Sequence, residues 1–128
     1  MDPWRRYSFQ ASGPEFHPGQ CGLKFSESFE PGSVATFGGS LGKVAHVGAA
    51  LYVIPPDIEC EPRQSHFAAV LAHVSQVQVP LRAAGATRFV LHMHRTFGSA
   101  CNEEFTRHEL RLLASLECDL FYVARLDS

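Results

Sequence analysis

The chain has 128 residues, of which 45% are hydrophobic and 19% charged, and its formal net charge is -2 at pH 7. This length fits one domain with a single core, and the balanced charge argues against nucleic acid or an anionic membrane as a partner. No stretch approaches the ~20 apolar residues of a membrane span, and residues 1–6 are not followed by the apolar run of a signal peptide. We therefore expect a cytoplasmic protein.

The N-terminal third combines one strand pattern with a long segment rich in Gly, Pro and Ser. Residues 6–11 alternate polar and apolar side chains, which predicts a half-buried strand with Tyr7, Phe9 and Ala11 on one side. Residues 13–42 carry four aromatic side chains that we expect to anchor the segment to the core, and residues 18–25 have room for a short helix. These anchors are Phe16, Phe25, Phe29 and Phe37. Within residues 44–54, which Gly48 interrupts, the apolar run of residues 49–54 is ended by two prolines and predicts a central strand.

The clearest helical period begins after Ser65, which is a suitable N-cap. Apolar residues then recur three and four positions apart, so they share one helix face. They are Phe67, Val70, Leu71, Val74, Val77 and Leu81. Pro80 lacks a backbone N–H and clashes with the preceding turn, so we expect a kink or a restart there, and Gly85 is a suitable end.

The C-terminal half predicts a strand, a helix and a final strand. Residues 88–97 alternate with a period of two, and the apolar side chains fall on one face. Thr106 and Glu109 have the spacing of a capping box, and Phe105 can pack onto Leu110 as a hydrophobic staple. The helix that follows runs to about Glu117, and residues 120–126 are rich in aromatic and β-branched side chains, as strands are.

The order of these elements predicts a single α+β domain over residues 1–128, with two helices packed on one face of a mainly antiparallel sheet. We expect both helices to pack on the same sheet face through their apolar side chains. These are Phe67, Val70, Leu71 and Val74 from the first helix and Leu110 and Leu113 from the second.

Several of these segments together resemble the bacterial domain-of-unknown-function family numbered 4279. The resemblance rests on the element order and on a few Gly, Pro and apolar positions over nearly the whole chain. The segments are residues 7–13, Phe16-His17-Pro18, Pro31-Gly32, residues 66–84, residues 88–97 and residues 104–110. It implies an α+β fold and a bacterial setting, and it brings no established catalytic residues.

His92 and His94 are the best candidates for metal ligands, because residues two apart on a strand point the same way and both can offer an imidazole nitrogen to zinc. A third ligand would have to come from His46, His108 or Glu104, and the sequence fixes no distance among them. The simpler interpretation places both histidines on the polar side of a half-covered sheet. We therefore predict no cofactor and no stoichiometric zinc in the purified protein.

Three further patterns have a chemical and a structural interpretation. Cys101 precedes a helix, where its thiol pKa could fall, but the sequence designates no histidine as its base. Glu103 and Glu104 could act as acid and base, although carboxylates before a helix commonly complement its dipole. Residues 38–43 are glycine-rich and end in Lys43, yet they lack the spacing of a phosphate-binding loop.

Asp57, Glu59 and Glu61 alternate after the two prolines, so in an extended segment they would form an acidic strip for a basic partner. A solvated loop is the simpler alternative.

With no coherent catalytic set, the sequence favours a non-catalytic protein-binding module, in its most specific form an immunity protein that neutralises a toxin. Its predicted contact residues are Asp57, Glu59, Glu61, Glu103 and Glu104. The alternatives are a metal-dependent enzyme or metal-binding protein using His92 and His94, and a small-ligand pocket lined by phenylalanines. The oligomeric state stays open.

Overall fold

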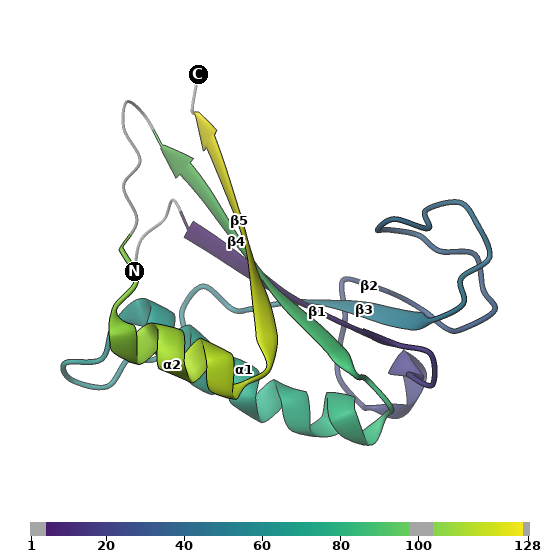
Figure 1. The fold of residues 1–128 in the computed structure, drawn as a ribbon, viewed down its shortest axis with the longest axis horizontal. Helices are drawn as coiled ribbons and strands as arrows, with labels where there is room; N and C mark the ends of the chain where they lie inside the picture. Colours follow the sequence, from purple (N-terminus) through teal and green to yellow (C-terminus); the bar gives the residue numbers. More distant parts are fainter. Residues whose placement is uncertain (1–4, 98–103, 127–128) are drawn as a thin grey trace.

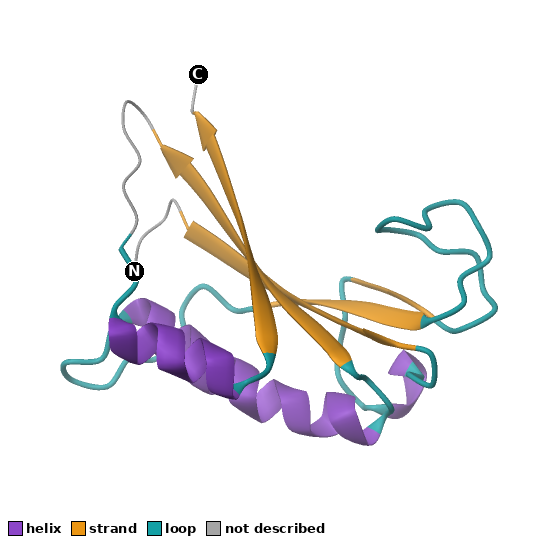
Figure 2. Cartoon of the chain, viewed as in Figure 1, coloured by secondary structure: helices purple, strands orange, loops and turns teal. Residues whose placement is uncertain are grey.

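The computed structural model describes residues 5–97 and 104–126, which form a five-stranded sheet with both α-helices on one face (Figures 1 and 2). The strands are β1 (Arg5–Gly13), β2 (Glu27–Phe29), β3 (Gly48–Val53), β4 (Arg88–Phe97) and β5 (Cys118–Leu126). The helices are α1 (His66–Ala83), α2 (Arg107–Ser115) and the short 3-10 helix η1 (Pro18–Gln20). The predicted α+β class is confirmed.

The sheet has the strand order β2-β3-β1-β4-β5, with β1 in the middle. All neighbouring pairs are antiparallel except β4 and β5, which run parallel because α2 connects them as a crossover. The mainly antiparallel sheet is thus as predicted, and β3 lies inside it rather than at an edge.

The core lies between the sheet and α1. Tyr7, Phe9 and Ala11 of β1 are buried together with alternate residues of β4, and the rings of Phe9 and Phe89 stack with centroids 5.5 Å apart. All six α1 positions of the predicted apolar face are buried as well. The side chains that the sequence predicts to be buried in β1, β4 and α1 therefore all face the core between the sheet and α1.

Of the kink or restart expected at Pro80, the structure excludes the restart, and it corrects one predicted contact of the second helix. The helix α1 continues without a restart to Ala83, and Pro80 lies in its last turns. Pro80 has no N–H for the carbonyl of Gln76, but Gln76 is exposed, so this carbonyl can bond to water. Leu110 is 49% exposed, so its predicted packing on the sheet is wrong. Glu109 points toward α1 instead. The leucines that pack against the core are Leu112 and Leu113 of α2 and Leu116 at its C-cap.

Gly85 ends α1 as predicted, with a positive φ of 104°. The chain also passes so close here that a Cβ would overlap the carbonyl oxygen of Glu15. Both the left-handed backbone and the close approach require glycine.

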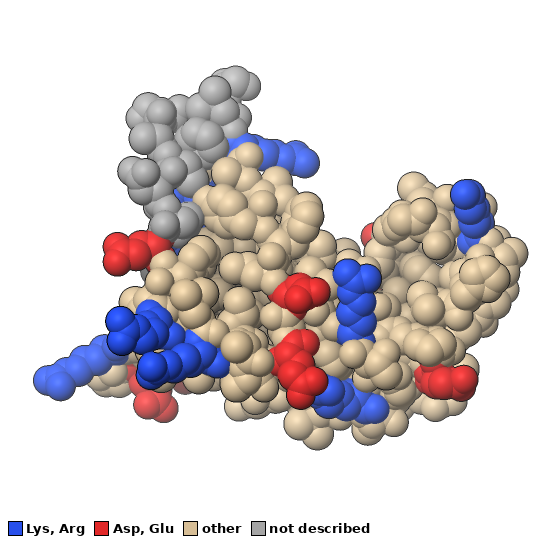
Figure 3. All heavy atoms as spheres, viewed as in Figure 1, with Lys and Arg blue, Asp and Glu red and all other residues tan. Residues whose placement is uncertain are grey.

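The face of the sheet away from the helices, here called the outer face, is covered only in part. A second apolar cluster joins Phe29 and Ala49, which face each other on this side of β2 and β3, to Ala35 and Ala45 of the following loop. We call residues 33–47 the lobe; Figure 1 shows it rising on the side of the sheet away from the helices, and Figure 3 shows a hollow between it and the strands. In the described part of the chain, no helix is both long and apolar enough to cross a bilayer.

Candidate functional site

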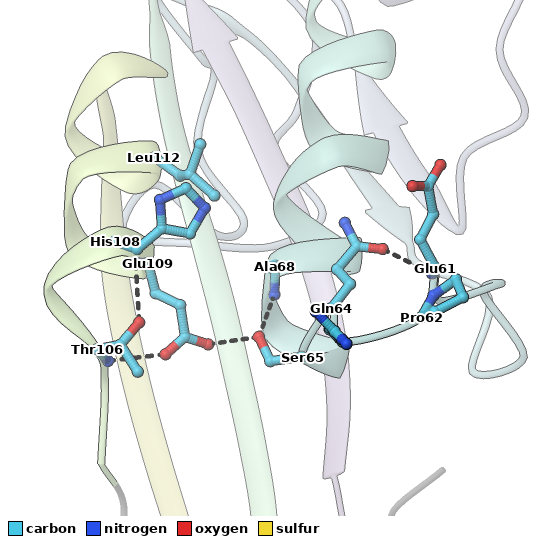
Figure 4. Close-up of a pocket in the computed structure, with 10 residues that line it drawn as sticks. Glu61, Pro62, Gln64, Ser65, Ala68, Thr106, His108, Glu109 and Leu112 are labelled. Atoms are coloured by element: carbon cyan, nitrogen blue, oxygen red, sulfur yellow. Dashed lines mark hydrogen bonds between the residues drawn. The ribbon is translucent and has the colours of Figure 1, made fainter.

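The N-terminal ends of α1 and α2 lie side by side and are joined through one buried carboxylate (Figure 4). Ser65 caps α1 by accepting a hydrogen bond from the backbone N–H of Ala68 at 3.0 Å, and its hydroxyl donates to Oε2 of Glu109 at 2.8 Å. Oε1 of Glu109 accepts a hydrogen bond of 2.7 Å from the backbone N–H of Thr106, and the Thr106 hydroxyl caps the Glu109 N–H. The predicted capping box is confirmed, and its carboxylate also ties α2 to α1.

Glu109 is only 5% exposed, and its charge is stabilised where it lies. Burial by itself raises the pKa of Glu109, but hydrogen bonds from Thr106 and Ser65 and the nearby charge of Arg5 outweigh that effect and hold the pKa below its usual value. A carboxylate between two helix N-termini also complements both dipoles. Glu109 is therefore an internal anion of the fold.

The opposite end of α2 is fixed to α1 in the same manner. Gln78, which is 5% exposed, donates a hydrogen bond of 2.8 Å to the carbonyl oxygen of Leu116 just beyond α2. Arg82 donates to the same oxygen at 3.4 Å and lies over the ring of Phe89. Two polar contacts, one at each end of α2, thus set how the helix pair packs.

A cavity of about 410 Å³ opens over the corner where the two helices begin. Figure 4 shows the His108 ring beside Leu112 and the Glu61 carboxylate pointing away from Glu109. Glu61 here helps to close the turn, since its backbone N–H donates to the side chain of Gln64 at 2.9 Å. The one buried carboxylate of the corner is engaged by both helices, so the geometry favours a structural role over acid–base chemistry.

The segment of the predicted acidic strip is not a strand, and it has turns at residues 56–57 and 62–63. Asp57 and Glu59 line a shallow cavity with His73 on the flank of α1, whereas Glu61 lines the corner cavity. All three are exposed, as is Glu104, and Glu103 lies outside the described residues.

His92 and His94 lie on the outer face of β4, as the strand period predicts. Their rings are nearly parallel, with centroids 6.2 Å apart, and Nε2 of His92 is 3.1 Å from Oε1 of Gln10 on β1. Burial, with a smaller effect of His94, lowers the pKa of His92. Within residues 5–97 and 104–126, no three or more His, Cys, Asp or Glu side chains are grouped for a metal ion, so His46, His108 and Glu104 do not complete this pair.

The other candidates give no catalytic arrangement in the described chain. Cys101 lies outside the described residues, and Cys118 is buried, which raises its thiol pKa to about 11. The glycine-rich residues 38–43 form turns in the lobe and lead into β3 rather than a helix, unlike a phosphate-binding loop. Phe16 is fully buried, and Phe29 packs on Phe37 with ring centroids 5.0 Å apart, so these aromatic side chains fill cores.

Sequence reasoning missed the apolar surface of the lobe. Nine large hydrophobic side chains of the described residues are exposed, and four of them lie within its 15 residues. They are Val34 (57%), Leu41 (62%), Val44 (59%) and Val47 (37%). An available signal was the presence of these residues among glycines and serines, where polar side chains are usual.

Comparison with known proteins returned no match among family models, curated proteins or solved structures.

Proposed function

We propose that this chain is a non-catalytic protein-binding module and, in its most specific form, an immunity protein that neutralises a toxin in a bacterial cytoplasm. The observation that carries the proposal is the apolar surface of the lobe. Exposed apolar side chains that gather on one loop commonly mark a protein contact. Leu41 and Val44 are the most exposed of them, and burying such a side chain contributes about 1.5–3 kcal/mol.

Two further features support a binding role. The hollow beside the lobe in Figure 3 offers a concave surface, and on the face shown there charges of both signs are interspersed. The resemblance to family 4279 fits a small bacterial module of this kind. In Figure 1 the segment between β3 and α1, which carries Asp57, Glu59 and Glu61, runs on the side of the molecule away from the lobe, so the two surfaces can be tested separately.

The test is co-expression of the chain with the toxin encoded beside it, followed by affinity measurement on the purified pair. We expect Leu41→Ser/Val44→Ser to weaken binding about 100-fold or more, since burial of two apolar side chains would be lost. Val79→Ser is the matched control, because Val79 is 69% exposed on α1, away from the lobe.

Two results would count against the proposal. If Asp57→Ser/Glu59→Ser/Glu61→Ser abolishes binding while the lobe variant does not, the contact lies on the acidic loop. If the chain neutralises no protein encoded beside it, the immunity function is wrong.

The second candidate function, a metal-binding protein, is favoured by one observation, the parallel histidine pair on β4. One described chain supplies only two of the ligands that a zinc site needs.

A further inference from the structure

The histidine pair of β4 has the features of half a metal site. His92 lies directly between Ser8 of β1 and Phe121 of β5 in the sheet register, and His94 lies between Arg6 and Val123. All of these side chains belong to the outer face, which the helices do not cover. The two imidazoles therefore stand side by side on an accessible surface.

Gln10 prepares His92 for a metal ion. Because Oε1 of Gln10 accepts a hydrogen bond from Nε2 of His92, the proton is held on Nε2 and the lone pair is on Nδ1. Metal-binding histidines usually have such a second hydrogen bond, which fixes the tautomer and the ring orientation.

The ligand count decides what completes the site. Zinc takes four ligands at about 2.0–2.1 Å, so two nitrogens of a tetrahedral site are about 3.4 Å apart. The ring centroids are 6.2 Å apart, and the exposed His94 ring can approach that separation by turning about its side-chain torsions while His92 keeps its bond to Gln10. The described chain has no third ligand nearby, but a second copy related by a two-fold axis supplies the same pair again.

We propose that two copies of this chain bind one zinc ion between their outer faces, with His92 and His94 of each copy as the four ligands. The surroundings of the pair suit a contact between copies. Phe121 is 55% exposed beside His92, and Val123 is half-buried beside His94, so apolar surface flanks the ligands. Arg6 is exposed, and its long side chain can extend away from the ion into solvent.

This site uses the β4 and β5 half of the outer face, whereas the proposed toxin contact is on the lobe beside β2 and β3. The inference rests on the second candidate function, metal binding by the histidine pair, and not on the toxin contact, so either can fail without the other. One zinc per two chains departs from the expectation that the purified protein contains no stoichiometric zinc, because that expectation considered the ligands of a single chain.

The experiment measures the mass of the full chain in solution by light scattering, first with EDTA and then with half an equivalent of zinc. We expect the mass to rise from 14.1 kDa to twice that value, with one zinc per two chains by elemental analysis. His94→Gln, at an exposed position, should weaken zinc-dependent association at least tenfold, and His92→Gln should do the same. His108→Gln is the matched control, because His108 is exposed on α2, on the other side of the sheet.

Circular dichroism melting of each variant separates loss of the site from loss of the fold. Retention of the zinc-dependent dimer in a folded His94→Gln variant would overturn the proposal. So would a wild-type chain that remains a monomer in zinc, or one that binds one zinc per chain without association.

Discussion

Replacement of Glu109 tests how the two helices are held together. Glu109→Ala removes the acceptor of the Thr106 N–H at 2.7 Å and of the Ser65 hydroxyl at 2.8 Å. A lost helix cap costs about 1 kcal/mol, and a hydrogen bond to a charged group contributes about 1.5–3 kcal/mol. We therefore expect a loss of about 2–4 kcal/mol, a large share of the ~5–15 kcal/mol stability of a domain. Glu109→Gln keeps the shape and one acceptor, so about 1–2 kcal/mol is expected.

Urea denaturation at pH 7 measures the loss as a lower midpoint. A double-mutant cycle of Ser65→Ala with Glu109→Ala should give a coupling energy of about 1 kcal/mol, because the two side chains share a hydrogen bond. Equal midpoints for wild type and Glu109→Ala, or additive single losses, would refute the role of the carboxylate as a link between the helices.

The pH dependence gives a second test with a defined sign. The pKa of Glu109 in the folded chain lies below its ordinary value of 4.5, so the unfolded chain takes up this proton first as the pH falls. The contribution of Glu109 is therefore complete above about pH 4.5 and is lost as the pH falls through the folded pKa. The stability difference between wild type and Glu109→Gln should shrink over that range. A difference that stays constant down to the acid transition would contradict this assignment.

Three further predictions concern packing, backbone and thiol reactivity. Leu71→Ala should lower the free energy of unfolding by about 2–5 kcal/mol in urea denaturation, because Leu71 is 2% exposed. Leu110→Ala should lower it by less than about 0.5 kcal/mol, because Leu110 is 49% exposed. Equal losses would be inconsistent with the observed face of α2. Gly85→Ala should destabilise the chain by about 2 kcal/mol or more, as calorimetry can show, since φ is 104° and a Cβ meets a backbone oxygen. Burial raises the pKa of the Cys118 thiol to about 11, whereas Cys60 is exposed. In the folded chain at pH 8, Cys118 should therefore be alkylated far more slowly than Cys60, as peptide mapping can show. Comparable rates would mean that β5 opens readily.

Local patterns in the sequence determined most of the elements. The alternation in β1 and β4 and the period of α1 predict their buried faces, because a side chain's direction follows from the strand or helix period. The Thr106 capping box is a contact within four residues, so its spacing alone identifies it. Even the two-helix arrangement on one sheet face follows from element order, since apolar faces must be buried against each other.

Only the tertiary structure decided which side chains of different elements contact one another. Glu109 is a plain capping residue in the sequence, and its bond to Ser65, 44 positions away, exists only because the helices begin side by side. Leu110 was misassigned because an apolar residue near a helix start does not reveal which face meets the sheet. The lobe folds onto the outer face through its own small cluster, a long-range contact that no local period encodes. His92 and His94 were paired by strand geometry, but Gln10 comes beside them only through the register of β1 with β4.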